Sequence, residues 1–174
     1  MSLSHELLGM ENVGLAWGFR VSPSSCENPL YYSQYIQLSA MGDQKSGQSM
    51  THVLVDDEIG LLAGYVSLRA TSLISVGENG LPVVHPTIEI AELAVDERYE
   101  RKGVGTELVN IALGAADFLR QHWLGIKYIA VCADPSAVGF YEKEGFRSVA
   151  TLYEIPRDGW NDNCVPMYIA LPEE

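Results

Sequence analysis

Residues 89–106 read EIAELAVDERYERKGVGT, and this stretch decides the fold. An apolar strand up to Val95 is followed by a basic turn and then by the start of a helix. A helix N-terminus presents unpaired backbone N–H groups and the positive end of the helix dipole. Gly103 and Gly105 allow a ligand to approach that backbone closely, and Arg101 and Lys102 add positive charge. The stretch therefore predicts an anion-binding turn suited to a phosphate or pyrophosphate.

The composition is that of a globular chain. We expect the 174 residues, 47% of them hydrophobic, to form a single domain over residues 1–174. No apolar run is long enough to cross a bilayer, and the first residues lack the basic and apolar regions of a signal peptide, so no membrane association is expected. The three cysteines show no metal-ligand spacing, and Cys132 lies in an apolar run typical of a buried thiol. We therefore expect a reducing, cytoplasmic location.

The charge balance is strongly acidic. The chain has 23 acidic and 11 basic residues, for a formal net charge of −12. Such a surface repels nucleic acid in bulk and favours cationic partners. Nucleic acid is therefore not expected as a partner, although solubility alone also explains the excess of acidic residues.

The order of elements predicts an α/β fold. Asp134 and Pro135 have the pattern of a helix N-cap and first helical residue, and Gly145 has that of a helix end. Polar, glycine-containing segments predict loops at 43–48 and 77–86, and a turn at 56–60 predicts a hairpin. We expect strands at 15–21, 51–55, 61–74, 87–95, 128–132, 146–153 and 164–171, and helices at 29–41, from the glycine turn onward, and from 134 to 145. This order predicts a mixed, mostly antiparallel sheet of about six or seven strands, flanked by helices and containing one parallel crossover.

Together with the glycine turn, two further segments indicate a protein family. They are Leu93-Ala-Val-Asp and Ala137-Val-Gly-Phe-Tyr-Glu-Lys-Glu-Gly-Phe146. With them the chain resembles the GNAT superfamily of acetyl-CoA-dependent N-acetyltransferases over about residues 15–171. A dinucleotide-binding turn would need a third glycine, and a P-loop would need Gly-Lys-Ser/Thr at its end. The sequence has neither pattern, so it favours neither of these nucleotide-binding motifs. The resemblance implies acetyl-CoA as co-substrate, a primary amine as acceptor and no metal. The family has Gln or Arg where this chain has Glu100, so we expect the Glu100 carboxylate to point outward or to pair with Arg98 or Arg101.

The resemblance also assigns coenzyme-binding residues. The backbone of Leu93, Ala94 and Val95 would bind the pantetheine arm and the thioester oxygen. Asp134 and Phe140 would face the coenzyme, although Asp134 is explained equally well as a helix N-cap. The turn that would bind the pyrophosphate consists of Arg101, Lys102, Gly103, Val104, Gly105 and Thr106.

The same resemblance gives candidates for proton transfer. Tyr141 would act as general acid toward the coenzyme sulfur, because a tyrosine with an ordinary pKa of about 10 stays protonated at neutral pH. The alternative is a core tyrosine beside Phe140. For the base, Glu89 matches the glutamate of several branches, and Glu92 replaces it if a bulge shifts the strand, because a regular strand sends the two to opposite faces. An ordered water could also serve in place of either.

The acceptor is less well defined. Tyr31, Tyr32 and Tyr35 would form one stripe on a helix, near the acceptor site by resemblance or facing the core. The whole pattern is similar to the branch that includes toxins of toxin–antitoxin modules, which acetylate aminoacyl-tRNA. The acidic charge, and Glu92 where that branch has arginine, favour a small-molecule or peptide amine instead. A non-catalytic acyl-CoA-binding module is the third possibility, and a homodimer could form through the edge of the late strands.

Overall fold

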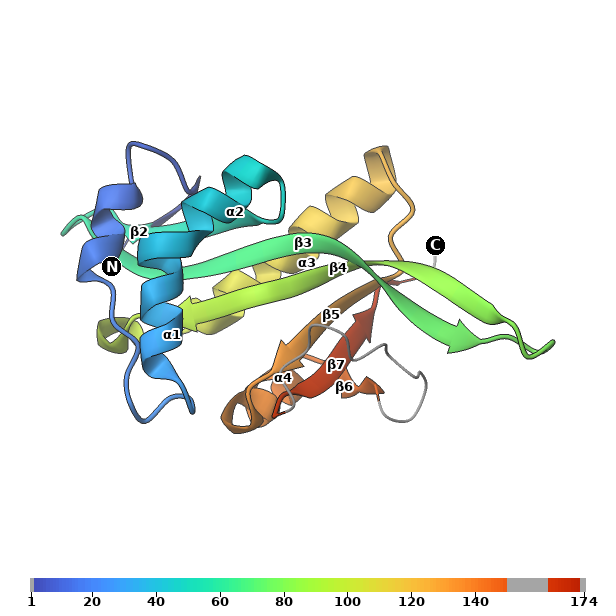
Figure 1. Cartoon of the computed structure of the whole chain (residues 1–174). Coiled ribbons are helices and arrows are strands. Elements are labelled where there is room, and N and C mark those ends of the chain that lie inside the picture. The colour runs from blue at the N-terminus through green and yellow to red at the C-terminus, as the bar shows by residue number, and fades with distance from the viewer. Residues whose placement is uncertain (1, 150–162, 173–174) are drawn as a thin grey trace. The chain divides into compact units, whose positions relative to one another are not determined.

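The computed structural model describes residues 2–149 and 163–172. Among the described residues, seven strands form one sheet in the order β1-β2-β3-β4-β5-β7-β6 (Figure 1). The β4–β5 pair is parallel, whereas the β1–β2, β2–β3, β5–β7 and β6–β7 pairs are antiparallel. The expected mixed sheet with one parallel crossover, flanked by helices, is therefore confirmed.

The elements have the following bounds. The strands are β1 Leu3–Leu7, β2 Met50–Asp56, β3 Leu61–Val76, β4 Pro82–Val95, β5 Tyr128–Ala133, β6 Arg147–Ser148 and β7 Val165–Ala170. The α-helices are α1 Pro29–Gln34, α2 Ala40–Ser46, α3 Val104–His122 and α4 Val138–Lys143. Short 3₁₀ turns are η1 Val13–Gly18, η3 Glu97–Tyr99 and η4 Pro135–Ala137, and η2 Tyr35–Ser39 is a π-helical turn between α1 and α2.

Contacts within the chain divide it into two compact units. The first unit consists of Met1–Arg69 and Ala91–Ala112, and the second consists of Ala70–Ile90 and Leu113–Glu174. Strands β3 and β4 and helix α3 therefore contribute residues to both units.

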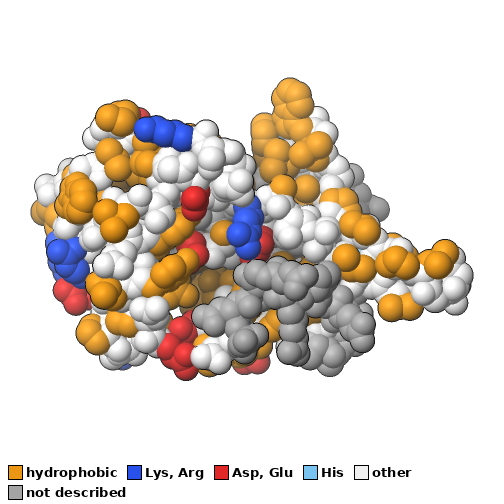
Figure 2. Space-filling view, in the orientation of Figure 1, with side chains coloured by type: hydrophobic (Ala, Val, Ile, Leu, Met, Phe, Trp, Pro, Cys, Tyr) orange, Lys and Arg blue, Asp and Glu red, His pale blue; other side chains and the backbone are white. Residues whose placement is uncertain are grey.

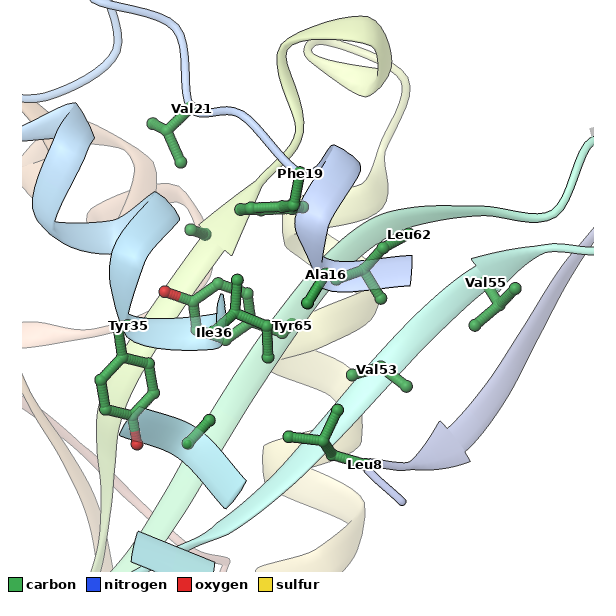
Figure 3. Close-up of a cluster of buried hydrophobic side chains, with 12 residues drawn as sticks. Leu8, Ala16, Phe19, Val21, Tyr35, Ile36, Val53, Val55, Leu62 and Tyr65 are labelled. Carbon is green, nitrogen blue, oxygen red and sulfur yellow. The ribbon is translucent and has the colours of Figure 1, made fainter. Parts of the chain in front are cut away.

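The core of the first unit lies between β2–β3 and the helical segment η2. Tyr35 of η2 stacks on Tyr65 of β3 at a ring distance of 5.9 Å, and Phe19 meets the same ring edge-on at 5.4 Å (Figure 3). Gly64 points to the opposite face, since successive strand residues alternate. A Cβ added there would lie 2.9 Å from Leu108 of α3. The first turns of α3 therefore cover the face of the sheet opposite to η2, and only glycine allows so close an approach.

The second unit is built around β5. Tyr128 of β5 and Tyr168 of β7 meet edge-on at a ring distance of 5.5 Å, in a cluster with Leu73 and Ala130. The hairpin of β3 and β4 is exposed, and Figure 2 shows hydrophobic side chains on it. Val76 and Val84 are 69% and 61% exposed there. Large apolar side chains thus remain in contact with solvent at the end of this hairpin.

A disulfide links Cys132 of β5 to Cys164, with Cα atoms 5.4 Å apart. The prediction of a buried thiol at Cys132 is therefore wrong. The antiparallel register pairs Cys132 with Pro166, which brings the residue just before β7 within reach. Cys26 is not part of a disulfide. One reason to expect a reducing location was that the cysteines were thought to be unpaired. The disulfide removes that reason.

Two predictions in the N-terminal half are also wrong. The strand expected at 15–21 is the 3₁₀ turn η1 followed by extended chain. Ala16 and Phe19 are both buried three residues apart, which is the repeat of a 3₁₀ turn. The loop expected at 43–48 begins later, because α2 continues to Ser46 and ends at Gly47, whose φ is 75°.

Strand boundaries differ at three further places. Strand β1 was not expected, and β4 begins at Pro82 rather than at residue 87, so the loop expected at 77–86 is a shorter turn. Of the strand expected at 146–153, the structure describes β6, and residues 150–153 lie outside the described residues. In the described part of the chain, no helix has the length and apolar character needed to cross a membrane.

Candidate active site

The C-terminal half of β4 provides a backbone edge. The β4–β5 ladder pairs Thr87–Ile90 with Tyr128–Val131, and among the described pairs it includes no residue of Ala91–Val95. Ala94 is buried in the core of the first unit, whereas Leu93 and Val95 are partly exposed. Backbone N–H and C=O groups require partners, and a strand edge beyond its ladder can supply them to a ligand.

The anion-binding turn follows directly. Arg101 and Gly103 adopt left-handed conformations, with φ of 59° and 84°, and α3 begins at Val104. Arg101, Lys102 and Gly103 are exposed. The N-terminus of this 19-residue helix is thus solvent-accessible and flanked by two cations, as a phosphate group requires. The residues of the turn fit the pyrophosphate of acetyl-CoA.

Glu100, the departure from the family pattern, has a specific partner. Its Oε1 accepts a hydrogen bond from the Ser25 hydroxyl, in the loop before α1. The Arg98 guanidinium binds Asp96 instead, with Nε 2.6 Å from Oδ1. The Glu100 carboxylate is therefore held by a neutral donor on a neighbouring loop.

Asp96 anchors the start of the turn and was not singled out in the sequence. Its carboxylate is fully buried and accepts hydrogen bonds from the backbone N–H groups of Arg20 and Arg98, each at 3.0 Å. The Arg98 side chain adds bonds of 2.6 and 2.8 Å. Burial alone would raise the pKa of Asp96, but these hydrogen bonds lower it below its ordinary value. An ionised Asp96 thus ties the turn to the segment that follows η1.

Tyr99 fixes the middle of the turn. Its hydroxyl donates to Asp56 Oδ2 at 2.9 Å, and the Lys102 ammonium lies 5.4 Å from the centre of its ring. Burial, with the hydrogen bond to Asp56 as the second cause, raises the pKa of Tyr99 to about 12. The sequence holds one signal for the roles of Asp96 and Tyr99 in the turn. Each lies beside a charged residue in the segment between the strand and the glycine turn.

The two candidate bases lie in different surroundings. Both residues belong to strand β4, three positions apart. Glu89 is only 5% exposed and lies opposite Ala130 of β5. Glu92 is partly exposed, and its Oε1 accepts a hydrogen bond of 2.6 Å from the Tyr31 hydroxyl.

The tyrosine stripe is confirmed as a cluster. The Tyr31 ring lies 5.3 Å from that of Tyr32 and 6.5 Å from that of Tyr35. Tyr35 is buried, whereas Tyr31 is 45% exposed. Burial raises the pKa of Tyr31, and the hydrogen bond to the Glu92 carboxylate raises it further. Tyr35 thus belongs to the core, and Tyr31 presents a neutral, protonated side chain at the surface.

The remaining candidates belong to the second unit. Asp134 caps η4, since its Oδ1 accepts a hydrogen bond of 2.9 Å from the Ser136 N–H. Tyr141 is 5% exposed, with its ring 5.0 Å from that of Phe140 and 5.4 Å from that of Phe146. No group of three or more metal-ligating side chains is found where the structure is described.

The fold and the turn are those of an acyltransferase that uses acetyl-CoA. The model of the acetyltransferase (GNAT) family matches residues 15–146, and the chain belongs to this family.

Several solved structures share the fold. The chain is similar to a bacterial toxin (20% identity, TM-score 0.72, covering 97% of this chain and 90% of that one). It is also similar to a mutant of KacT, with 17% identity and a TM-score of 0.76, over 98% of this chain and 95% of that one. A third similar structure is AtaT complexed with acetyl-methionyl-tRNAfMet, with 18% identity and a TM-score of 0.74, over 95% of this chain and 94% of that one.

Proposed function

We propose that this protein transfers the acetyl group of acetyl-CoA to a primary amine, and that the amine is the α-amino group of an aminoacyl-tRNA. The backbone edge of Ala91–Val95, continuing into the exposed N-terminus of α3, carries the first part of the proposal. The acceptor is supported by the likeness to AtaT, solved with acetyl-methionyl-tRNAfMet, over nearly the whole chain.

The turn and the strand edge would hold the coenzyme. Backbone N–H groups from Gly103 to Thr106 would donate to the pyrophosphate, with Arg101 and Lys102 supplying charge. The backbone of Leu93 and Val95 would bind the pantetheine arm and the thioester oxygen. Such donors suit a developing negative charge because they are already oriented when the reaction begins.

The proton transfers would be divided between two residues. The amine nitrogen attacks the thioester carbonyl carbon, and the bond from that carbon to sulfur breaks. Glu89, directly or through water, would accept the proton that the amine loses. Tyr141 would donate a proton to the departing thiolate. A positioned general acid contributes roughly 10² to 10⁴ in rate.

A small-molecule or peptide amine is the second candidate acceptor, favoured by the net charge of −12. A protein that binds tRNA neutralises phosphates with lysine and arginine, so its affinity falls steeply with salt. The 11 basic residues would therefore need to be concentrated at the tRNA-binding surface.

The acceptor is tested with two substrates that share one amine. Transfer of labelled acetyl from acetyl-CoA is measured with methionyl-tRNA and with methionine amide. The proposal predicts transfer to methionyl-tRNA that declines as salt is raised from 50 to 200 mM. Equal rates with both acceptors, insensitive to salt, would favour the small-molecule reaction. No transfer to either, with acetyl-CoA bound, would favour a non-catalytic binding module.

The role of Tyr141 is tested by the Tyr141→Phe variant. Because only the hydroxyl is removed, we expect kcat to fall roughly 10²- to 10⁴-fold, while the affinity for acetyl-CoA stays within about twofold. Tyr168→Phe, a change at another buried tyrosine of the second unit, is the control and should keep its kcat. Unchanged turnover in Tyr141→Phe would exclude the hydroxyl as general acid.

A further inference from the structure

The contact between Tyr31 and Glu92 has no role in the mechanism above. It joins α1 to β4 within the first unit, 61 residues apart in sequence. A partly exposed carboxylate and an exposed tyrosine ring are therefore held together beside the residues expected to bind the thioester.

We propose that Glu92 and Tyr31 form a binding site for the ammonium group of the acceptor, so that Glu92 recognises the acceptor instead of acting as the base. This inference rests on the proposed acetyl transfer. It narrows the acceptors to amines that arrive positively charged.

The chemistry of the cluster fits a cation. Aromatic faces attract ammonium groups, and an adjacent carboxylate adds direct charge attraction. The Tyr31 hydroxyl donates to Oε1 of Glu92, and a carboxylate offers about four acceptor positions in all. The hydrogen bond from Tyr31 thus orients the carboxylate, and an N–H donor of a ligand would take another of these positions.

The charge around the cluster has the required sign. Burial is the main cause of the raised pKa of Tyr35, and the negative charges of Asp43 and Glu92 contribute to it. Asp43 and Glu92 thus place negative charge near the Tyr35 ring, which is the sign that attracts a cation. The raised pKa of Tyr31 keeps its hydroxyl in the neutral donor form at physiological pH.

The position fits the reaction. Glu92 precedes Leu93 directly in β4, so their Cα atoms are about 3.8 Å apart. This segment lies beyond the β4–β5 ladder. An ammonium bound at Glu92 would lie close to the backbone that is expected to hold the thioester. It carries one proton more than the attacking amine, and that proton goes to Glu89 or to water.

The test is binding of tetramethylammonium, a cation that cannot be acetylated, with tert-butanol as its neutral analogue. Binding is followed by NMR of the labelled tyrosine rings in the whole protein. We expect the Tyr31 signals to shift and saturate with tetramethylammonium and not with tert-butanol. Equal binding of the two, or no shift with either, would overturn the proposal.

Variants separate the ring from the carboxylate. Glu92→Gln and Tyr31→Leu should each weaken tetramethylammonium binding at least about tenfold, whereas Tyr31→Phe, which keeps the ring, should retain it. Glu97→Gln, which removes an exposed carboxylate of the same unit, is the control. Unchanged binding in Glu92→Gln, with its acetyl-CoA affinity intact as evidence of folding, would contradict the proposal.

Kinetics distinguish recognition from base catalysis. With the acceptor that wild type acetylates, Glu92→Gln should raise KM about tenfold and leave kcat within about twofold, since uniform binding is lost. A fall in kcat of roughly 10² or more would show that Glu92 is the base. Failure to bind acetyl-CoA would refute the proposed acetyl transfer, whereas acetylation without ammonium binding would refute this inference alone.

Discussion

Replacing Asp96 by asparagine should destabilise the first unit. The carboxylate receives bonds at Oδ1 from the N–H and Nε of Arg98, and at Oδ2 from the Arg20 N–H and an Arg98 Nη. An asparagine NH₂ in place of either oxygen would face two donors, so two of the four bonds are lost. A hydrogen bond to a charged group contributes about 1.5–3 kcal/mol. Since the Arg98 side chain is 42% exposed, we expect a loss of about 2–4 kcal/mol in all.

The assay is urea unfolding of Asp96→Asn. The control is Asp117→Asn, which removes the carboxylate of a more exposed ion pair with Arg120, at 3.5 Å. Surface pairs contribute about 0–1 kcal/mol, so this variant should unfold nearly as wild type. A free energy of unfolding for Asp96→Asn within about 0.5 kcal/mol of wild type would refute the reasoning.

The pH dependence adds a second readout. Because the folded-state pKa of Asp96 is lowered, its stabilisation is complete above the ordinary aspartate pKa of about 3.9. It is lost as the pH falls through the folded-state pKa. The difference between wild type and Asp96→Asn should therefore be constant from pH 5 to 8 and shrink below about pH 4.

Two further changes test stability. Tyr99→Phe removes the 2.9 Å bond to Asp56 and should cost about 1.5–3 kcal/mol in urea unfolding. Since the folded-state pKa of Tyr99 is raised to about 12, this difference should persist up to about pH 10 and vanish as the pH approaches 12; a difference independent of pH would contradict it. Cys132→Ser opens a disulfide that spans 32 residues and should cost about 3–4 kcal/mol. Thermal melts with and without reductant measure this loss, and identical melts would contradict a bond that forms in solution.

The sequence predicted the centre of the fold well because its signals there are local. The apolar run ending at Val95, the basic turn and the following helix depend on neighbouring residues. The N-cap at Asp134 and the helix end at Gly145 also depend on neighbouring residues. Both appear in the structure, with Asp134 bound to the Ser136 N–H and Gly145 at a φ of 93°.

The errors occur where distant parts of the chain decide the structure. Strand β1 is an edge strand whose pairing with β2 specifies it, and its own sequence is largely polar. A loop was expected at 77–86, yet Pro82 and Pro86 both lie in β4, before its ladder with β5 begins at Thr87. A proline there removes no bond of the β4–β5 ladder. A short apolar run such as 15–21 suits either a strand or a helical turn.

The candidate site was predicted unevenly for the same reason. The glycine turn is a local pattern, and the sequence identified it. The contact of Tyr31 with Glu92 and that of Ser25 with Glu100 join residues 61 and 75 positions apart. No spacing rule predicts such contacts, because they depend on how α1 and the loop before it pack against β4 and the turn.

The measurement that tests the central claim most directly is calorimetric titration with acetyl-CoA of wild type, Gly103→Ala and Gly47→Ala. Both glycines have positive φ, 84° and 75°, with no described atom within 4 Å of an added Cβ. Alanine there costs about 1–2 kcal/mol of backbone strain at either position. If the N-terminus of α3 binds the pyrophosphate, wild type and Gly47→Ala bind acetyl-CoA alike, and Gly103→Ala binds it at least about tenfold more weakly. Equal affinity in all three proteins, or no binding by wild type, would contradict the account.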